Sequence, residues 1–148
     1  MKKKQLEDYC AAEFQNMALV LNELSSVVRP GKEQYSVADI AAISTFIHNF
    51  YNGVENIIKR LLIAENVTVQ SSPSWHKELL KTAAEKDIVS KEMHDTLSEY
   101  LAFRHFFIHA YAFIVEWEEM KALAEDVNNV FESFKFAVND YINKKYSL

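Results

Sequence analysis

Glycine and proline, the residues that most often interrupt helices, occur only twice each in this chain of 148 residues. An all-β protein needs turn residues much more often, because each of its many hairpins ends in a tight turn. Hydrophobic residues make up 49% of the chain, which is enough to bury one continuous core at this length. The sequence therefore predicts an all-α fold in a single domain over residues 1–148.

Apolar residues recur at steps of three and four along four long segments, which places them on one face of a helix. The predicted long helices run from Cys10 to about Arg29, over residues 37–65, from Ser90 to about Val115, and from Met120 to Tyr141. A shorter helix is predicted over residues 73–85. Long helices with short connections form an antiparallel four-helix bundle. We expect the short helix to lie across one end of that bundle.

The expected helix starts carry residues that suit an N-cap. Ser36 or Asp39 is expected to cap the second helix and Ser90 the fourth, whereas Ser72 is followed by Pro73, a favourable residue in the first turn of the short helix. Gly53 lies in the middle of the second helix, where glycine costs about 1 kcal/mol relative to alanine. We interpret it as the point of closest approach of another helix.

Several apolar residues fall outside these helix faces, namely Phe106, Phe107, Phe113 and Phe136. One small bundle cannot bury all of them in its own core. Apolar surface that a monomer would expose is typical of a contact with a second chain. The pattern therefore predicts a homodimer.

The remaining composition excludes several classes of protein. No run of apolar residues is long enough to cross a membrane, and no apolar stretch follows the first lysines as an export signal would require. Cys10 is the only cysteine, so no internal disulfide can form and a cytoplasmic location fits best. The formal net charge of -5 means that any bound RNA needs a local basic patch.

Arg104, His109 and Tyr111 form the pattern Arg-x-x-x-x-His-x-Tyr, which suits RNA cleavage. Histidine can take the proton of a 2′-hydroxyl group or protonate the leaving oxygen, because it titrates near neutral pH. Arginine is permanently charged and can hold the scissile phosphate. Cleavage by the RNA's own 2′-hydroxyl needs no metal and no cofactor, and leaves a 2′,3′-cyclic phosphate.

These three side chains cannot all point in one direction from a straight helix. An ideal helix separates Arg104 from His109 by about 140° around its axis, while Tyr111 returns almost under Arg104, about 10 Å along the axis. Either the backbone is irregular between residues 104 and 109, or a second copy of the motif completes the cleft across a two-fold axis. We favour the shared cleft of a dimer.

Three segments of the chain resemble HepT, the family of HEPN-domain toxins in HEPN/MNT toxin–antitoxin modules. They are FYNGVEN at residues 50–56, SWHKELL at residues 74–80 and FRHFFIHAY at residues 103–111. The resemblance covers nearly the whole chain. It implies a homodimeric HEPN helical bundle that acts as the ribonuclease toxin of a type VII-like module and cuts cellular RNA, such as tRNA or mRNA. Arg104 and His109 match the catalytic residues.

The resemblance also implies a partner, a minimal nucleotidyltransferase antitoxin of the MntA kind. This enzyme would transfer AMP from ATP to the motif tyrosine, which is Tyr111 here. An adenylate beside the cleft adds bulk and a negative phosphate where the RNA phosphate must lie. Relatives often carry a second arginine where this chain has Ile108, so we expect RNA affinity either to be lower here or to draw on other cations.

The other residues of the three segments have weaker functional interpretations. Asn52 and Glu55 lie one turn apart on the second helix and either orient the motif or face solvent. Trp75 and His76 are interpreted as packing and capping groups.

Three alternatives to the ribonuclease are open. His105 and His109 are spaced to bind a metal ion from one helix face, although the usual helical motifs Glu-x-x-His and His-Glu-x-x-His do not occur. A second alternative is an inactive HEPN binding subunit that partners a nucleotidyltransferase. A purely structural dimer is the third.

Overall fold

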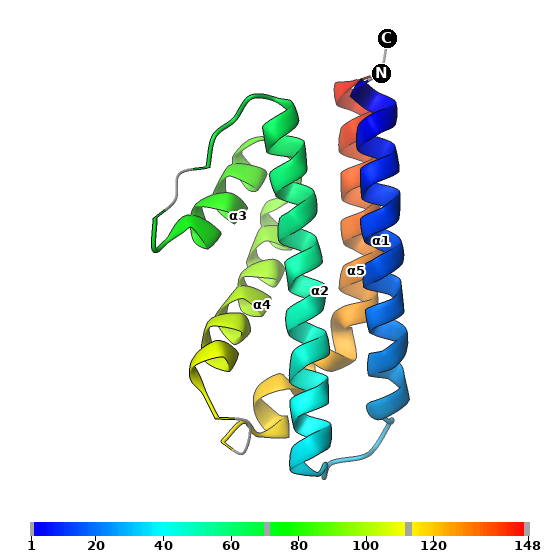
Figure 1. The fold of residues 1–148 in the computed structure, drawn as a ribbon, viewed down its shortest axis with the longest axis vertical. Helices are drawn as coiled ribbons and strands as arrows, with labels where there is room; N and C mark the ends of the chain where they lie inside the picture. Colours follow the sequence, from blue (N-terminus) through cyan, green and yellow to red (C-terminus); the bar gives the residue numbers. More distant parts are fainter. Residues whose placement is uncertain (1, 70–71, 112–113, 147–148) are drawn as a thin grey trace.

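The computed structural model describes residues 2–69, 72–111 and 114–146, which form five α-helices and no strand (Figure 1). The helices are α1 (Lys2–Val27), α2 (Val37–Ala64), α3 (Trp75–Glu85), α4 (Lys91–His109) and α5 (Trp117–Lys145). The predicted all-α class is therefore confirmed. Within the described residues, every helix is too short or too polar to cross a lipid bilayer.

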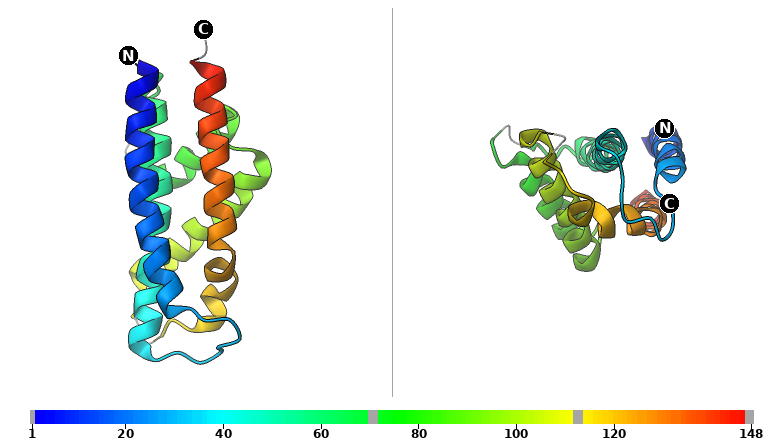
Figure 2. Two further views of the ribbon diagram at one scale, coloured as in Figure 1. Left: turned by 90° about the vertical axis from the view of Figure 1, so that its right-hand side faces the viewer. Right: turned by 90° about the horizontal axis from the view of Figure 1, so that it is seen from below.

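The long helices α1, α2 and α5 run side by side, and α4 leans against α2 and α5 at an angle (Figures 1 and 2). α1 runs antiparallel to both α2 and α5, so the first and last helical turns lie at the same end of the bundle. Among the described residues, α3 contacts only α2 and α4. It therefore lies on the flank of the bundle. The prediction that it lies across one end was wrong.

The core is built from the apolar faces that the spacing of three and four predicted. Phe14, Ile47, Phe50 and Phe134 come from three helices and are almost completely buried. The rings of Phe14 and Phe134 pack edge to face with centroids 6.3 Å apart, and those of Phe50 and Tyr100 on α4 with centroids 5.5 Å apart. Burying a side chain of this size contributes about 1.5–3 kcal/mol, so the four buried residues of α4 attach that helix to the same core.

Gly53 marks the close approach of α1 and α2. A Cβ atom added to Gly53 would lie 2.5 Å from Cγ and 2.7 Å from Sδ of Met17 on α1. Met17 is itself buried, so the space next to Gly53 is already filled. This confirms the interpretation of the glycine in the middle of the second helix.

Two of the expected helix starts are confirmed. The hydroxyl of Ser36 accepts a hydrogen bond from the backbone N–H of Asp39 at 3.1 Å, and the hydroxyl of Ser90 accepts one from Met93 at 3.0 Å. The prediction for the short helix was wrong, because α3 begins at Trp75, after Ser72 and Pro73. Those two residues lie in the turn before the helix.

The predicted extent of two long helices also needs correction. The helix that carries the motif ends at His109 and not near Val115, because Ala110 adopts an extended conformation. Val115 and Trp117 are both buried, and the chain must turn back toward the bundle to bury them. α1 begins well before Cys10, since Leu6 continues the buried face of that helix.

Candidate functional site

Arg104 lies on α4, and its charge acts on residues of the neighbouring helix α2. Burial and then the positive charge of Arg104 lower the pKa of His48. Burial and the Glu55 carboxylate raise the pKa of Tyr51, and Arg104 opposes that rise. The Nε atom of Arg104 is buried and has no hydrogen-bond partner among the described residues. The guanidinium group therefore has unused donor capacity.

His48 joins this cluster from the same face of α2. The side-chain nitrogen of Asn52 lies 3.3 Å from Nε2 of His48. The ring centroids of His48 and Phe107 are 5.6 Å apart. The Nδ1 atom of His48 is buried and has no partner in the described part of the chain. A charged imidazolium is disfavoured here, because burial and Arg104 both act against it.

Glu55 is a carboxylate in the core, with an exposed fraction of only 3%. Its Oε2 atom lies 2.8 Å from Nδ1 of His76, at the start of α3. Trp75 stacks against His76 with ring centroids 3.6 Å apart, and Nζ of Lys59 lies 4.5 Å from the centre of the Trp75 ring. Through these contacts α3 is attached to α2 beside Arg104.

His109 occupies the last residue of α4 and is exposed. Its ring centroid lies 4.7 Å from that of His105, one turn earlier. Tyr111 follows the helix and is 71% exposed. The expectation that Tyr111 lies under Arg104 on one helix was wrong, because the helix has already ended.

The backbone from Arg104 to His109 is continuous α-helix, so an irregular backbone does not bring these two residues together. The separation of about 140° around the axis therefore applies. Arg104 is half-buried against α2, whereas His109 is open to solvent at the end of the helix.

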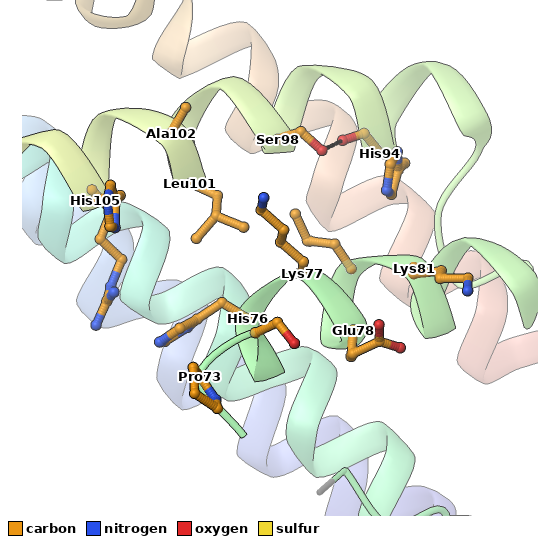
Figure 3. Close-up of a pocket in the computed structure, with 13 residues that line it drawn as sticks. Pro73, His76, Lys77, Glu78, Lys81, His94, Ser98, Leu101, Ala102 and His105 are labelled. Carbon is orange, nitrogen blue, oxygen red and sulfur yellow. Dashed lines mark hydrogen bonds between the residues drawn. The ribbon is translucent and has the colours of Figure 1, made fainter. Parts of the chain in front are cut away.

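A groove of about 770 Å³ lies between α3 and α4 (Figure 3). His105 lines one end and His94 lines the other, with Lys77 between the two helices, and Arg104, next to His105 in the sequence, also lines the groove. Leu80, Leu101 and Ala102 supply apolar surface. The groove is thus rich in imidazole and cationic groups in a chain whose net charge is negative.

The sequence analysis missed the roles of two residues of the site, His76 and His48. His76 was assigned to packing and capping, but it pairs with the buried Glu55 and also lines the groove. His48 was not considered at all. The available signal was His48, Asn52 and Glu55, which follow one another at steps of four and three and therefore share one face of the helix.

The simpler interpretation, that Asn52 and Glu55 both face solvent, was wrong. Glu55 is buried and Asn52 is half-buried beside His48. Of the apolar residues assigned to a dimer contact, Phe136 is 75% exposed, whereas Phe106 and Phe107 pack partly against the core. Phe113 lies outside the described residues.

A metal site would need several ligands close together. Within the described part of the chain, no group of three or more histidine, cysteine, aspartate or glutamate side chains could hold a metal ion.

A comparison with protein-family models matches residues 42–145 to a family described as HepT-like protein. The matched region starts in α2, ends with α5 and contains both the buried cluster and the whole motif. The comparisons with curated proteins and with solved structures gave no match.

Proposed function

Because this chain belongs to the HepT-like protein family, which includes ribonucleases, we propose that it is the metal-independent endoribonuclease toxin of a toxin–antitoxin module. The observation that carries the proposal is the placement of Arg104 and His109 near the end of α4. Arg104 has an unpartnered Nε atom and His109 is exposed. A phosphate-binding cation and an exposed general base are the two groups that this chemistry requires.

The reaction is a transesterification within the RNA. The 2′-oxygen attacks the adjacent phosphorus, the bond to the 5′-oxygen breaks, and a 2′,3′-cyclic phosphate and a 5′-hydroxyl group form. His109 takes the 2′-hydroxyl proton or delivers one to the leaving oxygen. Arg104 stabilises the negative charge that builds on the phosphate, and a well-placed donor of this kind contributes about 2.7–4 kcal/mol to the transition state.

We propose that the catalytic cleft is shared between two copies of the chain. Arg104 and His109 diverge on one regular helix, so Arg104 of one protomer would act with His109 of its partner. Ile108 and Ile114 are each 50% exposed beside the motif. Apolar surface at this end of α4 suits a contact across a two-fold axis.

Tyr111 is the proposed site of regulation by a minimal nucleotidyltransferase. Its phenolic oxygen would attack the α-phosphorus of ATP, with pyrophosphate leaving and AMP remaining on the tyrosine. The exposed position of Tyr111, two residues after His109, supports access by another enzyme. The adenylate would place a negative phosphate next to the cleft and repel RNA.

The decisive experiment incubates the purified protein with total tRNA in excess EDTA. We expect products that end in 2′,3′-cyclic phosphate, and we expect His109→Ala to reduce the rate by about 10²–10⁴-fold. DNA of matching sequence is the substrate control, since it lacks the attacking hydroxyl. An inactive wild-type protein, or a His109→Ala variant that cuts equally well, would refute the ribonuclease proposal.

The shared cleft has its own test, in which Arg104→Ala and His109→Ala proteins are unfolded together and refolded. In a shared cleft, each mixed dimer has one intact site, so the mixture should recover up to roughly a quarter of wild-type activity. A cleft within one chain has no intact site in the mixed dimer. Refolding each variant alone is the control.

The inactive binding subunit is the alternative. It predicts that a neighbouring nucleotidyltransferase adds AMP to the protein, detected by mass spectrometry, although the unmodified protein cuts no RNA. Tyr111→Phe tests the acceptor in both cases. Unchanged modification of that variant would show that AMP is attached elsewhere.

A further inference from the structure

The groove between α3 and α4 gathers positive and titratable groups from both helices. Its lining includes six such residues, His76, Lys77, Lys81, His94, Arg104 and His105, and one acidic residue, Glu78. Lys77, Lys81 and Arg104 outnumber the single carboxylate, so the lining is net positive even with the histidines neutral, although the whole chain carries a net charge of -5. A local basic patch is what RNA binding by an acidic protein requires.

The two lysines of the groove are available to a ligand. Lys77 and Lys81 are both exposed on α3, and no carboxylate of the described chain forms an ion pair with either. Other lysines are paired, as Lys91 is with Asp95 at 3.5 Å and Lys121 with Glu33 at 2.9 Å. Arg104 at the end of the groove also has a buried Nε atom without a partner among the described residues.

The groove ends at His105, one helical turn before the proposed catalytic histidine. On α4, the lining residues His94, Ser98, Ala102 and His105 follow one another at steps of four, four and three. His109 comes four residues after His105 and therefore continues the same face. Along α4 the path from His94 to His105 is about 16 Å long, which is enough for a few nucleotides of single-stranded RNA.

The shape and chemistry of the groove suit a nucleic acid strand. Ala102 and the exposed edge of Leu101 form apolar surface for ribose and base, and Lys77 extends between the helices (Figure 3). Imidazole rings at both ends can stack on bases or bind phosphate. We propose that this groove binds the backbone of the RNA strand next to the phosphate that His109 and Arg104 act on, an inference that rests on the proposed function.

The test measures RNA binding apart from cleavage. In a His109→Ala protein, the affinity for a short fluorescent polyuridine is measured by anisotropy over a series of salt concentrations. We expect Lys77→Ala with Lys81→Ala to weaken binding about tenfold at low salt. The slope of log affinity against log salt should fall by about 1.4, since each lost phosphate contact contributes about 0.7 for a single strand.

The matched control removes two exposed lysines outside the groove, Lys32 in the loop after α1 and Lys144 on α5, with Lys32→Ala and Lys144→Ala. It lowers the net charge by the same amount. Equal weakening of RNA binding in both variants would show that only total charge matters and would contradict the groove proposal. Binding by the Lys77/Lys81 variant within twofold of its parent would overturn it as well. Circular dichroism confirms that each variant is folded.

The outcomes also separate this inference from the proposed function. If the wild-type protein cuts RNA but the Lys77/Lys81 variant binds RNA normally, the groove proposal is wrong and the ribonuclease proposal is supported. If RNA binding depends on Lys77 and Lys81 but no RNA is cut, the groove proposal is supported and the ribonuclease proposal is wrong. If the His109→Ala parent binds no RNA, the groove proposal fails, and the cleavage assay with wild-type protein decides the other.

Discussion

Nδ1 of His76 lies 2.8 Å from the buried carboxylate of Glu55, and this contact attaches α3 to the middle of α2. A carboxylate with only 3% of its surface exposed is unfavourable in a protein core unless it has a hydrogen-bonded partner. His76 supplies that partner. The same residue lines the groove together with Arg104, so this pair helps to hold the groove wall in position.

Removing His76 should therefore destabilise the protein more than an average surface substitution. We expect His76→Ala to lower the free energy of unfolding by about 3 kcal/mol, because the Glu55 carboxylate is left buried without its partner. Urea denaturation measures the change. The double variant Glu55→Leu with His76→Leu should lose less, since it leaves no unpaired charge. A loss below about 0.5 kcal/mol for His76→Ala would contradict a structural role for the pair.

His48 should make the protein less stable in mild acid. Its pKa in the folded state is lowered from 6.5, chiefly by burial and then by Arg104. Below pH 6.5 the unfolded chain therefore binds more protons at this residue, and stability falls as the pH drops below that value. Unfolding measured at about pH 7.5 and about pH 5.5 should show a smaller difference for His48→Gln than for wild type. His94→Gln, on the outer part of α4, is the control variant.

At Gly53, two opposing effects decide whether a substitution by alanine stabilises or destabilises the protein. Alanine would gain about 1 kcal/mol of helix propensity, but its Cβ atom would lie 2.5 Å from Cγ of the buried Met17, and such overpacking costs about 1–3 kcal/mol. We expect Gly53→Ala to be destabilising by about 1 kcal/mol in thermal or urea unfolding. In a Met17→Ala background the same substitution should be neutral or stabilising. Equal effects in both backgrounds would mean that Met17 is not the obstacle.

The proposed dimer contact is tested most directly at Ile108. This side chain is 50% exposed next to His109, and a charge placed there would be buried in the proposed contact. We expect Ile108→Glu to dissociate the homodimer in sedimentation analysis and to abolish RNA cleavage. Leu19→Glu changes an equally apolar residue that is 62% exposed on α1, and it should leave both unchanged. A dimer that survives Ile108→Glu must use another surface.

The helices were predictable because their apolar spacing is regular and their caps are local. Ser36 and Ser90 act through hydrogen bonds to residues three positions later, and such a contact can be read from the sequence. Gly53 was also predictable, because a glycine inside a helix is unfavourable unless something lies against it.

The candidate site was less predictable, because its contacts join residues that are distant in sequence. Glu55 and His76 lie 21 residues apart, and only the angle between α2 and α3 brings them together. The end of α4 at His109 was missed for a similar reason. Periodicity continues through residues 110–115, whereas the burial of Val115 and Trp117 requires the chain to turn.

Within the part of the chain that the structure describes, α3 is attached to α2 and α4 alone, and this affects how the molecule fluctuates. α3 is short and buries three of its residues, Leu79, Leu80 and Ala83, so it can open locally while α1, α2 and α5 stay packed. Segments with few buried contacts exchange their amide hydrogens by such partial opening, at a lower free energy than global unfolding. The amides of α3 should thus exchange before those of α2, and one wall of the groove can move to admit strands of different shape.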